Sequence, residues 1–197
     1  MISYFHHFGG ADGLGENVSL FDAVYFIPIG FMMLMFMNPA GAFLQKVVHP
    51  KLLIAMGSLI GVASALLAAQ CTTFFLFLLS FGVLGHIGVG FCYFPPLVCG
   101  WEWLPNRKGM VTGIILGAYG FSGFLLSFVS LTIVNPDNKS PLVYPNGDMF
   151  YGKEIAAKVP YLMTIFAVIF GCLGFISFAL INRNPDFVDL ASPLQGG

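Results

Sequence analysis

The chain has 197 residues, of which 57% are hydrophobic and only 9% are charged, and its formal net charge at pH 7 is −1. A soluble domain carries about 25% charged residues, so this chain has too few charges to cover the surface of a water-soluble globule. The composition excludes a soluble enzyme and a disordered chain, and the small net charge gives no basic surface for nucleic acid. It predicts an all-α integral membrane protein in contact with the lipid bilayer.

Residues 1–19 precede the first long apolar run. They contain neither a basic start nor an apolar core, and Asp12 and Glu16 lie among them, so they do not resemble a signal peptide. We interpret this segment as an extracytoplasmic loop. His6 and His7 are adjacent, so their side chains diverge in any regular structure, and no further ligands follow at metal-site spacing. The four cysteines show no zinc or disulfide pattern, and we predict no metal site.

Five apolar runs are long enough to cross a bilayer, which takes roughly 20 helical residues. Lipid offers no partner to backbone polar groups, and the runs are too long for barrel strands, so helices are the expected structure. The expected bundle covers residues 20–181, with spans at about 20–43, 52–70, 74–98, 110–134 and 159–181. A long loop, 135–158, joins the last two spans, and a tail, 182–197, follows them.

The distribution of Lys and Arg predicts the side of the membrane that each loop occupies. All eight of these residues lie outside the apolar runs. If every run spans the membrane, one side holds five of them: Lys46, Lys51, Arg107, Lys108 and Arg183. Because positive residues favour the cytoplasmic side, we expect those loops and the tail to be cytoplasmic. Residues 1–19 and 135–158 are then extracytoplasmic.

Glycines recur within three of the spans at spacings that place them on one helix face. Small residues let helix backbones approach closely in lipid, where burial of apolar surface does not drive association. We expect the spans to pack through these glycines, although glycine is also frequent in membrane helices without this role. The candidates are Gly57 and Gly61 in the second span, Gly82 and Gly85 in the third, and Gly113 and Gly117 in the fourth.

One ionisable side chain lies deep in a span. His86 falls about twelve residues into the third run, or ~18 Å deep, and intramembrane ionisable groups often mark substrate or ion paths. Tyr119 lies at a similar depth in the fourth span, and Tyr93 lies nearer the cytoplasmic end of the third. These side chains could contact a small carboxylate, and His86 could carry a proton. The alternatives are a neutral histidine that joins two helices and tyrosines that only fill space.

The connection between the third and fourth spans carries a distinctive run. Trp103 and Pro105 end one glycine-rich helix, Arg107 and Lys108 hold the turn at the cytoplasmic face, and Gly109 starts the next helix. This run resembles the connection between helices 4 and 5 in the major facilitator superfamily, above all in its oxalate/formate antiporter and monocarboxylate-transporter-like branch. The resemblance implies that the chain corresponds to helices 2 to 6 of the amino-terminal half of such a transporter.

That resemblance implies a carrier for small carboxylates that works by alternating access and needs the other half of the transporter as a partner. The second hypothesis is a carrier-derived structural subunit of a larger membrane complex, without transport activity. The absence of charge deep in the spans favours this subunit, and so does Gln45, which replaces the acidic residue of the family's loop motif. Neither a nucleophile–base pair nor a phosphate-binding loop is present, so we predict no catalytic residue, no cofactor and no enzyme.

Overall fold

The computed structural model describes residues 1–10, 15–144 and 147–186. Across these residues, five helical segments are long and apolar enough to cross a membrane, and one small two-stranded sheet lies outside them. The chain is therefore an all-α polytopic membrane protein. The prediction of about five membrane-spanning helices is confirmed.

The spans are built from the following elements. The first consists of α2 (Leu20–Val24) and α3 (Phe26–Leu44), the second is α4 (Pro50–Gln70), and the third combines α5 (Phe74–Phe77), the π-helical turn Leu78–Leu84 and α6 (Gly85–Trp103). The fourth is α7 (Lys108–Val134), entered through the 3-10 turn Pro105–Arg107, and the fifth is α9 (Val159–Leu180). Outside the spans lie α1 (Ile2–Phe8), the hairpin of β1 (Leu142–Val143) and β2 (Met149–Phe150), and α8 (Lys153–Ala156).

Local side chains fix where the first three spans begin. The Ser19 hydroxyl accepts a hydrogen bond from the Phe21 N–H, while the Asp22 carboxylate accepts one from the Ser19 N–H. This reciprocal pair satisfies backbone donors that the start of a helix leaves without partners. Pro50 occupies the first position of α4, where a missing N–H leaves no helical bond unmade. The Thr73 hydroxyl caps α5.

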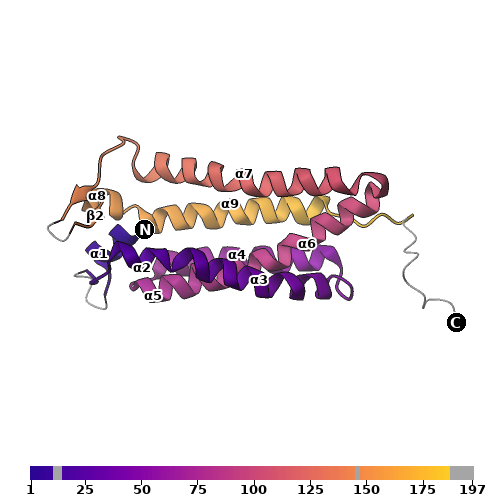
Figure 1. The fold of residues 1–197 in the computed structure, drawn as a ribbon, viewed down its shortest axis with the longest axis horizontal. Coiled ribbons are helices and arrows are strands. Elements are labelled where there is room, and N and C mark those ends of the chain that lie inside the picture. The colour runs from indigo at the N-terminus through magenta and orange to yellow at the C-terminus, as the bar shows by residue number, and fades with distance from the viewer. Residues whose placement is uncertain (11–14, 145–146, 187–197) are drawn as a thin grey trace.

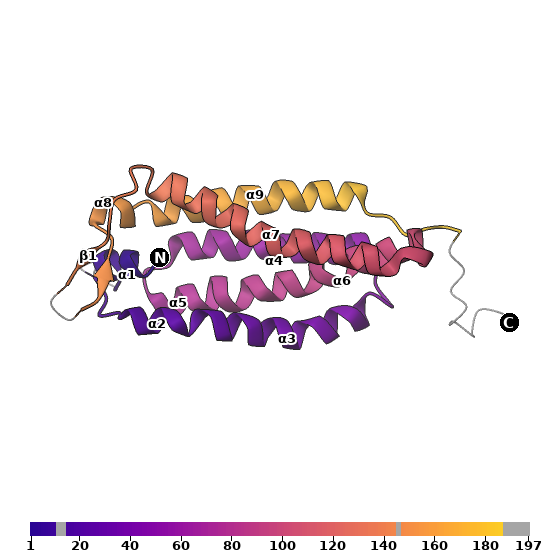
Figure 2. The ribbon, with the colours of Figure 1, turned by 45° about the horizontal axis from the view of Figure 1, so that its top comes forward.

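The helices form one elongated bundle with two well-separated ends (Figure 1). Figure 2 shows α3, α6, α4 and α9 side by side in that order, with α7 crossing in front of them. The helix α4 is central, because it packs against both α6 and α9. The helix α7 has far less contact with the bundle, and it touches α6 and α9 only in part.

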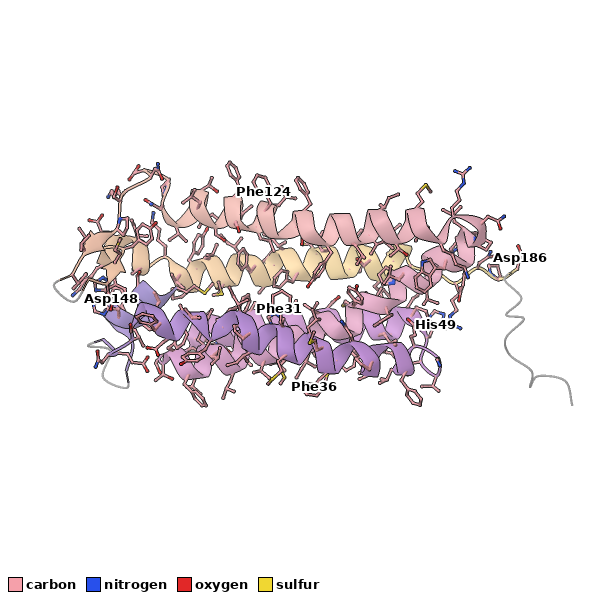
Figure 3. All side chains as sticks on the ribbon, viewed as in Figure 1. Phe31, Phe36, His49, Phe124, Asp148 and Asp186 are labelled. Carbon is pink, nitrogen blue, oxygen red and sulfur yellow. The ribbon has the colours of Figure 1, made fainter. Side chains whose placement is uncertain are left out.

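Charged and polar groups gather at the two ends of the bundle (Figure 3). Asp148 lies at the end that holds α1, α8 and the hairpin, which we call the α1 end, whereas His49 and Asp186 lie at the opposite end. Between the ends, Phe36 of α3 and Phe124 of α7 are each 64% exposed. Large aromatic side chains exposed along a belt between polar ends suit contact with lipid. The chain is a multi-pass membrane protein.

Several predicted segments differ from the structure. Residues 1–19 are not only a loop, because Ile2–Phe8 form α1, and residues 135–158 contain the hairpin and α8. The third span ends at Trp103 and not at residue 98, because Pro95 and Pro96 lie inside α6. Neighbouring groups in a membrane bundle can satisfy the backbone groups that proline frees, so the two prolines do not end the helix.

Gly57 of the second span and Gly88 of the third lie where α4 and α6 come closest. A Cβ at Gly57 would lie 2.6 Å from the Gly88 carbonyl oxygen, and a Cβ at Gly88 would lie 2.7 Å from the Gly57 carbonyl oxygen. Only glycine allows backbones to meet at this distance. A Cβ at Gly82 would lie 3.4 Å from the Phe26 ring, and one at Gly85 would lie 3.2 Å from a serine hydroxyl of α4. We call the contact through Gly57 and Gly88 the α4–α6 seam.

The glycines of the fourth span do not pack as predicted. A Cβ at Gly113 or Gly117 would meet nothing within 4 Å among the described residues. The reason is that α7 stands away from the other helices along its middle and buries a single residue, Val111. The described residues therefore make none of the contacts predicted through Gly113 and Gly117. Only the backbone of Gly61 takes part in the α4–α6 seam, where it faces Gly88. A Cβ at Gly61 would point into open space among the described residues.

Candidate functional site

A cavity of about 430 Å³ lies between α4, α6, α7 and α9, and we call it the central cavity. His86 and Tyr93 line it from α6, and Tyr119 lines it from α7. The fold thus brings the three candidate pathway residues to the walls of one cavity. It exists because α7 stands off from the bundle along its middle.

The His86 ring is held in one orientation. Its Nδ1 lies 2.6 Å from the Gly82 carbonyl oxygen, and since a carbonyl only accepts, Nδ1 carries the hydrogen. The ring also lies against Gly30 of α3, where a Cβ would stand 2.5 Å from the ring carbon Cε1. A Cβ at Gly30 would also lie 2.6 Å from Nε2, so this edge of the ring faces α3, which does not line the cavity. Among the described residues, Nε2 makes no hydrogen bond, and a carboxylate could reach it only if the ring turned away from Gly30.

Tyr93 and Tyr119 connect α6 and α7 at the central cavity. Their ring centroids are 6.2 Å apart at an interplanar angle of 84°, which is an edge-to-face contact. Such a pair contributes about 0.5–1.5 kcal/mol beyond the area that it buries. Within the described part of the chain, neither hydroxyl forms a hydrogen bond, so both are able to donate to a bound molecule.

Sequence reasoning missed four further polar residues of the central cavity, Ser58, Ser64, Cys92 and Ser177. The Ser58 hydroxyl and the Cys92 thiol are 3.9 Å apart, between α4 and α6. Each of the four is a lone polar residue within an apolar run, which was the available signal. Periodicity within one helix does not show which residues of different helices face the same cavity.

The walls of the central cavity are neutral. Of the residues that the structure describes, no Asp, Glu, Lys or Arg lines it. A carboxylate that entered alone would lose its hydration without gaining an opposite charge, which is strongly unfavourable. A carboxylate therefore needs a proton of its own or a protonated partner, and His86 is the side chain on the wall that can supply one.

The turn between α6 and α7 has the form that its sequence indicates. Trp103 ends α6, and Pro105 begins the 3-10 turn. Arg107, Lys108 and Gly109 are exposed, and a Cβ at Gly109 would meet no described atom within 4 Å. The turn therefore places its basic pair at the bundle end opposite α1, which we call the Trp103 end.

A polar cluster at the Trp103 end was not predicted. The Glu102 carboxylate, in a residue that is only 8% exposed, lies 3.7 Å from the Arg183 guanidinium. It also accepts a hydrogen bond from the Asn184 backbone N–H at 3.3 Å, and Arg183 donates to the Gln45 carbonyl oxygen at 2.9 Å. The cluster ties the segment after α9 to the ends of α3 and α6. The sequence signal was a single acid between two tryptophans, with no indication of its partners.

The α1 end is closed by segments outside the spans. The Gly10 N–H donates to the Thr72 carbonyl oxygen at 2.8 Å, and the Glu16 carboxylate accepts from the Phe74 N–H at 2.8 Å. These bonds tie the start of the chain to the turn between α4 and α5. Phe5 of α1 is 1% exposed and belongs to a buried apolar cluster with side chains of α4, α5 and α9.

The histidines of α1 lie against the hairpin. The His6 ring stacks on Phe150 with centroids 4.0 Å apart, and His7 Nε2 lies 2.9 Å from the Tyr151 carbonyl oxygen. Burial lowers the pKa of His6, and His7 adds to this lowering while Asp148 opposes it. No group of three or more His, Cys, Asp or Glu side chains in the described ranges could hold a metal ion.

Comparison with known proteins gives one informative similarity. The chain is 28% identical over 187 residues to apicoplast pyruvate carrier 1 of Toxoplasma gondii, a match that covers 89% of this chain and 33% of that protein. The chain thus spans about a third of the length of the curated relative it matches. No family model matches the chain. No solved structure matches it.

These comparisons correct the family assignment. The run from Trp103 to Gly109 resembles the major facilitator superfamily, but no family model matches the chain, that of the superfamily included. The relative found is named a pyruvate carrier, and its name gives the superfamily no support. The assignment to the oxalate/formate antiporter branch is therefore not upheld, nor is the numbering of the spans as helices 2 to 6. A proline, a basic pair and a glycine suit any tight cytoplasmic turn between two helices, so this run has little specificity.

Proposed function

We propose that the chain is part of a membrane carrier for a small carboxylate such as pyruvate, with His86, Tyr93 and Tyr119 on the substrate pathway. The observation that carries this proposal is the similarity, over 89% of the chain, to a protein named a pyruvate carrier. The central cavity supports it by offering hydrogen-bonding groups within membrane-spanning helices. On this proposal the chain is a carrier and not an enzyme.

The chemistry of pyruvate suits the groups on the cavity wall. Pyruvate has a carboxylate and a keto oxygen, which are hydrogen-bond acceptors. The hydroxyls of Tyr93 and Tyr119 are donors, and protonated His86 adds a donor and a positive charge. A carboxylate and a proton that enter together form a neutral pair, which reduces the desolvation penalty of the cavity.

Further membrane helices are needed to complete the carrier. The relative is about three times as long as its matched segment, and α7 leaves its glycine face uncovered among the described residues. From the Lys and Arg distribution, the Trp103 end faces the cytoplasm and the α1 end faces away from it. These assignments belong to the proposal, and the missing helices can come from the same polypeptide or from a partner chain.

Equilibrium binding of radiolabelled pyruvate to the chain in lipid nanodiscs tests this function. Tyr119→Phe keeps the ring and removes the hydroxyl, and loss of one hydrogen bond of about 1 kcal/mol weakens binding roughly fivefold. Tyr161→Phe is the matched control, because Tyr161 is 63% exposed on α9 and does not line the cavity. Absence of saturable binding, or equal effects of the two changes, would contradict the proposal.

A carrier-derived structural subunit is the second candidate function. The neutral walls of the central cavity favour it, because no described Lys or Arg stands there to hold an anion. Such a subunit binds no pyruvate, so the nanodisc experiment separates the two functions.

Uptake by the chain alone is a separate question. Five spans supply one wall of a pathway, so we expect proteoliposomes of the chain alone to take up no more pyruvate or lactate than empty vesicles. Saturable uptake that His86→Ala abolishes would instead show a carrier that needs no further helices.

A further inference from the structure

A second cavity, also of about 430 Å³, adjoins the central cavity. The two share three wall residues, Ile54, Pro96 and Ser177, one from each of α4, α6 and α9. The second cavity extends to Trp103 and Asn182, where α6 and α9 end. The two cavities therefore adjoin at the three shared residues, and together they extend from the interior of the bundle to the Trp103 end; we call them the path.

Aromatic rings close this path toward the α1 end. Phe81 lines the central cavity and stacks on Phe77 and Phe26, with centroid distances of 5.7 Å and 6.1 Å. The Phe77 ring lies 5.4 Å from Phe5 of α1. Both Phe5 and Phe77 are almost fully buried, at 1% and 2% exposed. The Trp103 end is therefore the direction along the helices in which the path continues.

Ile181 and Asn182 line the second cavity at the Trp103 end, and we call residues 181–186 the strap. The Trp103 indole N–H donates to the Asn182 carbonyl oxygen at 2.9 Å, and both residues line the second cavity. The Glu102 cluster holds the next two residues, Arg183 and Asn184, against the ends of α3 and α6. Trp103 is 54% exposed, and the Arg183 side chain is 44% exposed. Bonds at such exposed positions can open without disturbing the buried α4–α6 seam.

We infer that the strap is the gate of this path and that the Trp103–Asn182 bond holds the gate closed. The biological meaning of the gate rests on the proposed function, since a gate matters only where something passes. Its physical content is access from one side of the membrane to the central cavity. Access can be measured without any substrate.

Cys92 reports this access, because its thiol lines the central cavity. The other three cysteines, Cys71, Cys99 and Cys172, are replaced by Ala, and the chain is reconstituted in sealed liposomes. The permanently charged, membrane-impermeant reagent 2-(trimethylammonium)ethyl methanethiosulfonate is then added from one side or the other. A second single-cysteine variant, with Arg107→Cys at the exposed turn, identifies the side that carries the Trp103 end. We expect Cys92 to react only from that side.

Two tryptophans supply a matched pair of variants. Trp103→Phe keeps a large ring and removes the N–H that bonds Asn182, so we expect the Cys92 labelling rate to rise at least threefold. Trp101→Phe also removes an indole hydrogen bond at the same end, but its partner is the Thr112 hydroxyl of α7, at 2.9 Å. Because that bond does not involve the strap, we expect no change in the rate.

Three results would overturn the gate: an unchanged rate in Trp103→Phe, an equal rise in Trp101→Phe, or labelling of Cys92 from the α1 end. A parallel single-cysteine variant that retains Cys71, which is 9% exposed, checks folding, because a folded bundle keeps this thiol unreactive. If Trp103→Phe does not fold, Glu102→Gln removes the ion pair with Arg183 and is expected to give the same rise. Failure to bind pyruvate contradicts the proposed function and leaves the gate intact.

Discussion

The glycines of the α4–α6 seam and the glycines of α7 have opposite surroundings. In the α4–α6 seam, Gly57 and Gly88 bring two backbones so close that a Cβ at either position would meet a carbonyl oxygen at 2.6–2.7 Å. On α7, Gly113 and Gly117 face open space to at least 4 Å among the described residues. The comparison teaches that glycine spacing shows where a helix can be approached, whereas the neighbours decide whether it is approached.

The same comparison explains where the central cavity comes from. The helix α4 lies between α6 and α9 and is packed on both sides, so it forms a rigid frame. The helix α7 meets α6 near Val111, which lies beside Gly100, and meets the buried cluster near the α1 end through Leu126 and Val129. Between these contacts it spans the cavity with Tyr119 on the wall. Close packing on one side and loose packing on the other thus produce a cavity between the membrane-spanning helices.

The largest expected effect is at the seam. Gly57→Leu places a side chain where the Gly88 carbonyl oxygen stands, so α4 and α6 must separate. Overpacking of this kind costs about 3 kcal/mol, and we expect a clear loss of folded yield and of thermal stability in detergent. Size-exclusion chromatography and a thermal unfolding series measure both quantities. If this variant were as stable as the wild type, the seam would not depend on glycine, and the contrast with α7 would be contradicted.

A smaller effect is expected where α7 reaches toward α6. Tyr119→Ala removes the edge-to-face contact with Tyr93, and we expect the free energy of unfolding to fall by about 1 kcal/mol. Phe128→Ala is the control on the same helix, since Phe128 is 60% exposed and forms no ring contact among the described residues. Reversible unfolding in mixed micelles compares the two variants. Equal losses would mean that the Tyr93 contact does not hold α7 in place.

A still smaller effect is expected at the glycines of α7. A Cβ at Gly113 would meet no described atom within 4 Å, so we expect Gly113→Leu to change the free energy of unfolding by no more than about 0.5 kcal/mol. The measurement is the same thermal series as for Gly57→Leu, with both variants in one detergent. A loss as large as that of Gly57→Leu would show that another helix covers α7 in the membrane.

The smallest expected effect is a pH dependence of the stability of α1, and it should leave the α4–α6 seam and the glycines of α7 unchanged. The pKa of His6 is lowered in the folded chain, mainly by burial, so the folded state disfavours the charged imidazole. The folded state therefore has its full stability above about pH 6.5, which is the pKa of an unfolded histidine. It loses stability as the pH falls from there through the lower folded pKa of His6. Hydrogen exchange at pH 7.5 and pH 5, corrected for intrinsic rates, should show faster opening of α1 and no change at Gly57. His6→Gln should remove the difference, and a response confined to α4 would contradict it.

The sequence predicted the candidate pathway residues because polar side chains in apolar runs are conspicuous. His86, Tyr93 and Tyr119 stand out in this way, and the fold does place all three on one cavity. Their convergence depends on how α6 and α7 cross, which no periodicity within a single helix contains. The pairing of Glu102 with Arg183 was beyond reach for the same reason, because the two lie on different elements far apart in the chain.

By itself, the sequence determined that this is a multi-pass helical membrane protein, because backbone groups in lipid must bond within their own segment and long apolar runs therefore become helices. Runs of this kind can be counted without knowing their neighbours. Only the tertiary structure decided that Gly57 is packed, that Gly113 is open among the described residues, that α7 stands over a cavity, and that Asn182 meets Trp103 beside a second cavity. In lipid, helices associate through shape and scattered polar contacts and not through a general apolar drive, so the choice of partner is a property of the whole set of helices.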